Sequence, residues 1–336
     1  MVHCREFLDP VHCSAVTQNT HQRRFFFACL LNSSDHSWEV VMSPLVSVLV
    51  CIYNCTSTLK WALASLVAQT YENWEAVVVD DGSSDDPQSV VRAITDCRIR
   101  FFRFQNNSGR GVARQFALTK ARGKYIAFLD GDDWFYPSKI DKQMEVMENE
   151  PSLVLCSSPL AVANLRNRIT GVRHAPANGE EVPRTFRARP AWVPVPFASS
   201  LIKTNHAQEI GFDESLKRSE DFDFLMRLLS GQRFVLMSDV TYAYRAEQDV
   251  TANTSLRAAQ ETLRFNRKVV GKFVDDFPIL SRFMTLQCFG MLARTRVRRF
   301  LGIRFRDPQP SAEQIADFEH ARGIVTEQQA LLFGPE

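Results

Sequence analysis

Short apolar runs alternate with segments of helical spacing from residue 44 to residue 134. Runs in which almost every residue is apolar or small predict strands buried on both faces, over 45–52, 74–79 and 125–129. A further run alternates Arg with apolar residues, as a strand near a sheet edge would, over 99–104. Between the strands, apolar residues three or four apart predict helices over 59–67, 87–95 and 112–121.

The order of these elements predicts the fold class. Strands that alternate with helices indicate an α/β fold, in which right-handed crossovers build a mostly parallel sheet with helices on its faces. We expect a nucleotide-binding half of this kind over 44–134. Beyond it, the pattern predicts a Pro-rich loop around 190–196, a helix over 222–229 and a pair of strands within 234–244.

Composition excludes some partners and compartments. The chain has 336 residues and a formal net charge of +2. Proteins that bind nucleic acid typically have a larger excess of basic residues, so the charge does not indicate such a partner. Its 8 cysteines have neither the spacing of a zinc site nor the density of a disulfide scaffold, which favours a reducing, cytoplasmic setting. No apolar run of the sequence approaches the roughly 20 residues that a membrane-spanning helix needs.

The two ends of the chain differ from the middle. Residues 1–43 are rich in His and Cys and show little periodicity, so we interpret them as an atypical extension that is either disordered or not native. Met42 directly precedes the first clear strand and is a candidate for the natural start. We expect residues 256–336 to form a helical C-terminal region.

Within that region, the segment 282–306 carries seven arginines and no acidic residue among apolar side chains. One interpretation is the solvated face of a packed helix. The other is a basic amphipathic segment that rests on anionic lipid or holds an anionic acceptor. In the second case the protein would be peripheral at the inner face of a membrane. The sequence leaves both interpretations open.

Acidic clusters follow two of the predicted buried strands. Asp130 and Asp132 follow the strand that ends near residue 129, and Asp81 follows the strand that ends near residue 79. Crowded carboxylates repel one another unless a cation lies between them, and Mg²⁺ or Mn²⁺ takes oxygen ligands from carboxylates and phosphates. In open α/β sheets the ligand lies at the carboxyl ends of the strands. The clusters therefore predict a divalent metal and a nucleotide, although an acidic turn would use the same residue types.

A third acidic patch precedes the predicted helix over 222–229. Glu220 and Asp221 could simply favour the helix macrodipole. A carboxylate that faces the crevice could instead remove the proton of an acceptor hydroxyl. Asp81 also has two interpretations, since it could accept hydrogen bonds from a base or ribose or could cap the helix that follows it.

Five stretches of the chain closely resemble the motifs of family 2 inverting glycosyltransferases of GT-A fold, and they occur in the family's order. They are PLVSVLVCIYN at 44–54, SLVAQTY at 65–71, VDDGS at 79–83, GKYIAFLDGDD at 123–133 and SED at 219–221. The resemblance covers about 44–254. It implies a GT-A domain over 44–255, with a nucleotide-binding half over 44–134 and an acceptor half over 135–255.

The resemblance implies roles on the donor side. Cys51 and Tyr53 would lie beside the nucleotide base, with Cys51 where many members have Thr or Pro. Asp81 would bind the base, and Asp130 would contact the ribose or sugar region. Asp132, with Asp130 beside it, would hold the metal that bridges the diphosphate.

It also implies roles near the phosphates and the acceptor. Arg114 falls where the family often has a polar residue near the phosphates, although a helix-surface arginine fits the pattern nearly as well. Asp221 would be the catalytic base, and Glu220 would support it or contact the acceptor. One departure from the family is Glu247, which stands where many members have a His near the diphosphate or the metal.

The activity that the resemblance implies is that of a hexosyltransferase-type enzyme. It would move a sugar from a nucleoside-diphosphate sugar, most commonly a UDP-sugar, to a hydroxyl of a glycan or lipid-linked acceptor, as in the synthesis of a cell-envelope polysaccharide. Mn²⁺ or Mg²⁺ would stabilise the departing diphosphate, and direct displacement would invert the anomeric centre. The alternatives are a non-catalytic sugar-nucleotide-binding protein and a nucleotidyltransferase of similar fold.

Overall fold

The computed structural model describes residues 4–6, 28–31, 38–41, 43–176, 184–185, 195–216, 220–246 and 307–335. Several predictions lie outside the described residues. These are Met42 as the natural start, the basic segment 282–306, the position of Glu247 and the domain boundary at 255. The domain limits therefore stay predictions.

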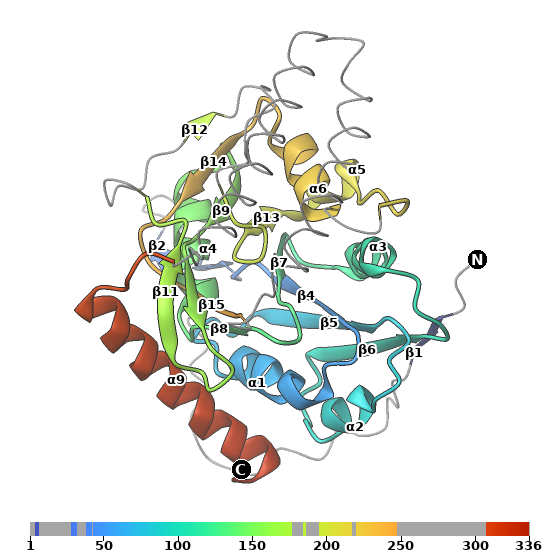
Figure 1. The fold of residues 1–336 in the computed structure, drawn as a ribbon. Coiled ribbons are helices and arrows are strands. Elements are labelled where there is room, and N and C mark those ends of the chain that lie inside the picture. The colour runs from blue at the N-terminus through green and yellow to red at the C-terminus, as the bar shows by residue number, and fades with distance from the viewer. Residues whose placement is uncertain are drawn as a thin grey trace, which may run out of the picture.

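Nine described strands form the main sheet, in the order β1-β6-β5-β4-β7-β13-β9-β14-β12 (Figure 1). In that order they are β1 Cys4–Glu6, β6 Ile99–Phe104, β5 Trp74–Asp80, β4 Val46–Ile52, β7 Tyr125–Phe128, β13 Leu201–Lys203, β9 Leu153–Ser157, β14 Arg233–Leu236 and β12 Arg184–Thr185. Strands β6, β5, β4 and β7 are parallel, whereas β13 is antiparallel to both β7 and β9. The sheet is therefore mixed, with a parallel centre.

The strands and helices predicted over 44–134 are confirmed to within a few residues. Their helices are α1 Thr56–Val67, α2 Pro87–Arg92 and α3 Arg110–Lys120. All seven positions of β5 are buried, as expected for a strand with helices on both faces. Helix α2 begins at Pro87, which lacks an N–H that the first turn would leave unpaired, and Asp86 accepts a hydrogen bond from the Ser89 N–H at 3.3 Å.

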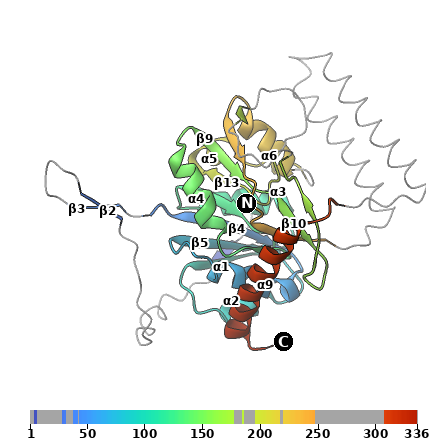
Figure 2. The same cartoon turned by 90° about the vertical axis from the view of Figure 1, so that its left-hand side faces the viewer.

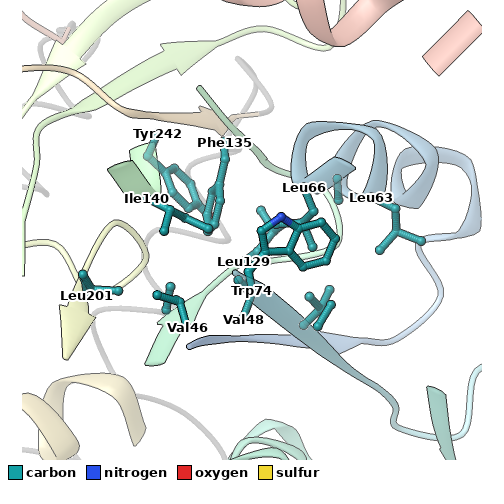
Figure 3. Packing of buried hydrophobic residues seen from close by; sticks show 14 of the residues in the cluster. Val46, Val48, Leu63, Leu66, Trp74, Leu129, Phe135, Ile140, Leu201 and Tyr242 are labelled. Carbon is teal, nitrogen blue, oxygen red and sulfur yellow. The ribbon is translucent and has the colours of Figure 1, made fainter. Parts of the chain in front are cut away.

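Helices cover both faces of the main sheet. Helices α1, α2 and α4 (Lys139–Asn149) pack on one face, and α3, α5 (Thr204–Ile210) and α6 (Glu220–Leu229) pack on the other. Because successive residues of a strand point to opposite faces, Val48 and Val50 enter the first core and Leu49 enters the second. Figure 3 shows the first core, in which the Trp74 ring lies beside Val48 and Leu66. The sheet thus forms the middle layer of three.

A second sheet corrects one prediction. Its described strands are, in order, β11 Ile169–Arg173, β10 Leu160–Ala163, β15 Tyr242–Arg245 and β8 Trp134–Phe135. The sequence predicts a pair of strands within 234–244, but β14 pairs with β9 in the main sheet and β15 pairs with β10 in the second sheet. The apolar pattern identifies both strands, whereas their partners lie far away in the sequence.

The helix α9 (Ala312–Phe333) lies across α1 and the second sheet (Figures 1 and 2). Its Phe318 and Val325 pack in one cluster with Trp134. The chain just before α9 is anchored by Arg173, which donates to both carboxylate oxygens of Asp307 at 2.6 and 2.9 Å. This part of the C-terminal region is therefore helical and packs against the rest of the chain.

Short strands also occur within residues 1–43. Strand β1 pairs with β6, and β2 (Ala28–Leu31) pairs with β3 (Trp38–Val41) in a separate two-stranded sheet. Strand β1 is the edge strand of the main sheet, and β6 is the next strand inward. This position agrees with the prediction, from its alternating arginines, that β6 lies near a sheet edge. Among the helices that the structure describes, none is long and apolar enough to cross a membrane.

Candidate active site

Three neighbouring strands bring the predicted donor-side residues to one edge of the main sheet. Strand β5 leads into Asp81, β4 leads from Cys51 into Tyr53, and β7 leads into Asp130. Because these strands are adjacent and parallel, their carboxyl ends meet at the same edge. The Asp81 N–H donates to the Ile52 carbonyl at 2.9 Å, which holds the end of β5 against β4.

The carboxylate of Asp81 is buried, and each of its oxygens accepts a backbone hydrogen bond. Oδ1 accepts from the Ser108 N–H at 2.7 Å and Oδ2 from the Gly109 N–H at 2.9 Å. Burial raises the pKa of Asp81, and these two hydrogen bonds oppose that shift. Asp81 does not cap the helix that follows it, because Asp86 does so. Instead it orders the loop just before α3, a contact that no sequence pattern indicates.

Asp80, which directly precedes Asp81, has a structural role in a tight turn. The Asp80 side chain is fully buried, and its Oδ1 accepts from the N–H and the hydroxyl of Ser83 at 2.9 and 2.5 Å. Gly82 has a φ of 73°, and a Cβ there would lie 2.6 Å from the carbonyl carbon of Asn106. Asp80 therefore stabilises the turn, and glycine permits the close approach of the 106–107 loop.

Arg114 connects the acidic residues of two distant motifs. Its side chain is 4% exposed, with Nη1 2.7 Å from Glu220 Oε1 and Nη2 3.2 Å from Asp130 Oδ1. The guanidinium also lies 4.6 Å from the centre of the Phe197 ring. Burial disfavours the charged form, but the carboxylates of Asp130 and Glu220 raise the pKa of Arg114 above its ordinary value. The interpretation of Arg114 as a helix-surface residue is therefore wrong.

The two acids at the start of α6 differ in exposure. Glu220 is 1% exposed, whereas Asp221 is partly exposed. Burial raises the pKa of Glu220, while the charge of Arg114 lowers it. Asp221 Oδ1 accepts from the Phe222 N–H at 2.8 Å. Glu220 therefore lies in the protein interior, whereas Asp221 is the acid of this pair that is accessible to solvent.

Asp132 has surroundings that fit a divalent cation. Its side chain is exposed, and it forms no salt bridge with any described residue. Although the carboxylate reaches the surface, loss of hydration among the surrounding protein atoms and the negative charge of Asp130 raise its pKa. The described residues contain no group of three or more His, Cys, Asp or Glu that could hold a metal by themselves. A cation bound to Asp132 would need oxygen ligands from the substrate as well.

Asp133, by contrast, has a structural role that the sequence analysis missed. It is 1% exposed, and it accepts from the Tyr242 hydroxyl at 2.8 Å and from the Arg245 N–H at 2.7 Å. Burial and the charges of Asp130 and Asp132 raise its pKa well above the ordinary value. Asp133 therefore joins the turn after β7 to β15. No sequence signal separates it from the neighbouring acids.

Gly131 serves the packing of the protein itself. A Cβ at Gly131 would lie 2.6 Å from Cys55 Sγ and 2.8 Å from Ile52 Cγ2. The Thr58 hydroxyl, in the first turn of α1, donates to the Gly131 carbonyl at 2.9 Å. Glycine at this position permits a close approach, and the side chain that approaches is Cys55. This contact seats the acidic turn on the beginning of α1.

Cys51 and Tyr53 present different surfaces to the site. Cys51 packs against the core beneath α3 and α6, and burial raises the pKa of its thiol to about 12, so the thiol stays protonated at neutral pH. Tyr53 follows β4 and is 50% exposed. The edge of the site next to Asp81 thus combines a neutral thiol with an accessible aromatic ring.

Comparison with known proteins identifies the family. Residues 47–202 match the family model described as Glycosyl transferase family 2. An uncharacterized glycosyltransferase of Rickettsia typhi is 29% identical over 223 residues, which cover 65% of this chain and 69% of that protein. The Escherichia coli UDP-Glc:alpha-D-GlcNAc-diphosphoundecaprenol beta-1,3-glucosyltransferase WfaP is 41% identical over 106 residues, which cover 32% of this chain and 42% of that protein.

Two solved structures share this fold. Residues 1–349 of TarS from S. aureus align with a TM-score of 0.53 at 20% identity, covering 84% of this chain and 80% of that chain. The mannosyltransferase PcManGT from Pyrobaculum calidifontis aligns with a TM-score of 0.52 at 18% identity, covering 87% and 85%. The sheet, the acidic strand ends and these similarities agree that the chain contains a glycosyl transferase family 2 region over residues 47–202, has a GT-A fold and is a glycosyltransferase.

Proposed function

We propose that this glycosyltransferase moves a sugar from a UDP-sugar to a hydroxyl of a glycan or lipid-linked acceptor, with inversion at the anomeric carbon. The observation that carries the proposal is the double ion pair of Arg114, because it brings Asp130 and Glu220 to one buried guanidinium. Asp221 is also among the charges that act on Arg114. The acid that follows β7 and the acids that begin α6 therefore lie around one guanidinium, which supports a common site.

On the donor side, the base would lie between Tyr53 and Asp81, next to Cys51. The electrostatic surroundings of the Cys51 thiol support this arrangement, since Arg114, Asp130 and Asp81 all act on it. Asp130 would contact the ribose or the sugar. With Asp81 oxygens already accepting two backbone hydrogen bonds, a base N–H would use a remaining lone pair of the same carboxylate.

Asp132, with Asp130 beside it, would hold Mn²⁺ or Mg²⁺ together with the diphosphate oxygens. When bound, the ion supplies positive charge that stabilises the departing nucleoside diphosphate. The structure of PcManGT was solved in complex with GDP-Man and Mn²⁺, which supports metal use in this fold. Arg114 would add a fixed positive charge behind Asp130 and would hold that carboxylate in place.

On the acceptor side, Asp221 would accept the proton of the attacking hydroxyl as the hydroxyl oxygen bonds to the anomeric carbon. The bond to the leaving diphosphate breaks in the same displacement, so the reaction needs no covalent enzyme intermediate and inverts the configuration. Glu220 would position Arg114 and the first turn of α6. The name of WfaP includes a UDP-sugar and a diphosphoundecaprenol acceptor, which supports a UDP-sugar donor and a lipid-linked acceptor here.

Calorimetric titration tests this proposal. The protein is titrated with UDP, GDP and dTDP, each with Mn²⁺ and with EDTA. We expect UDP to bind most tightly and only with Mn²⁺, and we expect Asp132→Asn to weaken that binding about tenfold or more, because it removes a charged metal ligand. Glu313→Gln, which removes an exposed carboxylate on α9, is the matched control. Failure of all three nucleotides to bind would contradict the proposal, and tight binding of GDP instead would correct the donor base.

A further inference from the structure

A cavity of about 520 Å³ lies at the end of the main sheet opposite the candidate active site. We call it the distal cavity; its lining residues are Ala121, Arg122, Gly123, Lys124, Lys203, Thr204, Asn205, His206 and Gln208. The turn of 121–124 enters β7, whereas Asp130 follows β7. At about 3.3 Å per residue, the two sites are therefore about 20 Å apart.

The lining of the distal cavity is cationic. Arg122, Lys124 and Lys203 carry positive charge, and the lining contains no Asp or Glu. Two carbonyls near the end of α3, shortly before Ala121 in the chain, already accept hydrogen bonds. The Leu118 carbonyl accepts from Gln208 at 3.2 Å and the Lys120 carbonyl from Arg100 at 2.9 Å. The charge of the cavity therefore favours an anion.

These cations are only partly neutralised by the protein. Lys124 forms a salt bridge of 2.7 Å with the exposed Glu148, and Lys203 donates to the Pro151 carbonyl. The Arg122 guanidinium forms no hydrogen bond or salt bridge with the described residues. A ligand could therefore be the main partner of the Arg122 guanidinium. It could also bind Lys124 and Lys203 while these lysines keep their contacts with the protein.

Thr204 provides an independent indication of a ligand. The residue is 7% exposed, lines the distal cavity, and its hydroxyl has no hydrogen-bond partner among the described residues. A buried hydroxyl without a partner is costly, and native proteins rarely retain one without a water or ligand beside it. A hydroxyl can donate to an anionic oxygen, which the surrounding cations would attract.

The backbone around the distal cavity is held in place. The N–H groups of Arg122 and Gly123 donate to the Ser47 hydroxyl at 3.0 and 2.8 Å, and the Thr204 N–H donates to the Lys124 carbonyl at 3.0 Å. A Cβ at Gly123 would lie 2.5 Å from the Leu45 carbonyl oxygen, so the turn can form only with glycine there. The cations thus project from two segments whose relative position is set before any ligand binds.

We propose that the distal cavity binds a phosphate group of a ligand other than the donor nucleotide. A phosphate can accept from a guanidinium, ammonium groups and a hydroxyl at once, which matches Arg122, Lys124, Lys203 and Thr204. The volume exceeds that of one phosphate and lies in the range of small-molecule sites, so it leaves room for further atoms of the ligand. It is either a soluble phosphorylated compound or the headgroup of a lipid.

Calorimetric titration with inorganic pyrophosphate, in EDTA and at low ionic strength, tests the proposal. Arg122→Gln/Lys203→Gln should weaken binding about tenfold or more, because each change removes a charge-assisted contact. Thr204→Val should weaken binding about fivefold while leaving the melting temperature of the free protein unchanged or higher, because the hydroxyl it removes has no partner. Arg92→Gln/Arg166→Gln removes the same charge from exposed positions elsewhere and should leave the affinity within about twofold.

Further measurements separate the outcomes. All variants should keep the UDP affinity of the wild type, which excludes unfolding and damage to the candidate active site. Equal pyrophosphate affinity in every variant, or an equal loss in the control, would overturn the proposal. Flotation with phosphatidic acid vesicles, compared with phosphatidylcholine vesicles, identifies the source of the phosphate. Binding to the acidic vesicles that depends on Arg122 and Lys203 indicates a lipid headgroup, and pyrophosphate binding without it indicates a soluble ligand.

Discussion

The carboxylates around Arg114 differ in exposure, and exposure separates their roles. The Glu220 side chain is 1% exposed and belongs to the interior, whereas the Asp130 side chain is 34% exposed and can pair with Arg114 and still face a ligand. Asp221 is partly exposed and has only its neighbour's N–H as a described hydrogen-bond donor. The sequence places these acids in motifs but does not distinguish the buried acid from the accessible one.

Asp221→Asn tests the proposed base. The change keeps the shape of the side chain and removes its ability to accept a proton, so we expect turnover to fall by about 100-fold or more and the affinity for UDP to stay within about twofold. Turnover is measured as release of nucleoside diphosphate, and affinity by calorimetry. Glu313→Gln, on the exposed side of α9, should retain wild-type turnover. Full turnover in Asp221→Asn would show that another group removes the proton.

Between elements, the main connection across the site is the pair formed by Arg114 of α3 and Glu220 of α6. Both side chains are buried, so removal of one partner deprives a charge in the interior of its nearest counter-charge. This arrangement orders α6 against α3 and so holds Asp221 at the edge of the site. Sequence patterning predicts both helices, but the pairing spans 106 positions and depends on the folded sheet.

A double-mutant cycle measures this connection. Arg114→Met and Glu220→Leu should each lower the free energy of unfolding by about 3 kcal/mol, because each leaves a buried charge with only a more distant or more exposed partner, Arg110 for Glu220 and Asp130 for Arg114. The double variant should be more stable than either single variant, since neither charge remains. Its turnover should stay low, because Asp130 and α6 lose their common contact. Additive losses in urea denaturation would show that the two groups are not coupled.

Helix α9 contributes to stability through the face that packs on Trp134. Phe318 is fully buried there, so Phe318→Ala should lower the free energy of unfolding by about 3 kcal/mol or more through lost packing and a residual cavity. Leu331, on the same helix, is 80% exposed, and Leu331→Ala should change stability by no more than about 0.5 kcal/mol. Urea denaturation of both variants makes the comparison. Equal effects would mean that α9 does not support the fold through this face.

At the scale of the whole molecule, a buried lysine makes stability depend on pH. Lys139 is fully buried, donates to Gln143 and to the Ser199 carbonyl, and has a pKa that burial lowers to about 7. Between about pH 7 and the ordinary lysine pKa near 10.4, the unfolded chain holds a proton that the folded chain has released. The free energy of unfolding therefore gains up to about 1.4 kcal/mol per pH unit in this range from Lys139.

Lys139→Met should remove the contribution of Lys139 to the pH dependence of the free energy of unfolding. Lys142→Met, at an exposed position on the same helix, should leave that pH dependence unchanged. The readout is how steeply the free energy of unfolding rises between pH 7 and 8.5 in each variant. The absolute stabilities are not compared, because Lys139→Met also removes a partner of Gln143 and so lowers stability at every pH. Above about pH 8.5, Cys51 and Cys55 act in the opposite direction, because burial raises their pKa to about 12 and only the unfolded thiols ionise. Equal slopes in both variants would show that Lys139 does not titrate in this range.

The fold of the first half follows from local patterns because its central strands β4, β5 and β7 are nearly continuous apolar runs buried on both faces. Strand β5 is an example, with all seven positions buried. Strands β14 and β15 show the limit of such patterns. Their sequences predict two strands that pair with each other, but in the structure the two strands belong to different sheets. Partner choice depends on β9 and β10, which precede them by about 80 residues.

The sequence by itself determined the GT-A class of this protein, the order of strands and helices over 44–134 and the motifs that carry acids to the strand ends. These features depend on near neighbours in the chain, which a pattern can encode. Only the tertiary structure decided which acids serve the protein itself. Asp81 orders the loop before α3, Asp133 joins two sheets, and Arg114 is buried between Asp130 and Glu220. Those distinctions arise from burial and from contacts between distant segments, which exist only once the sheet has formed.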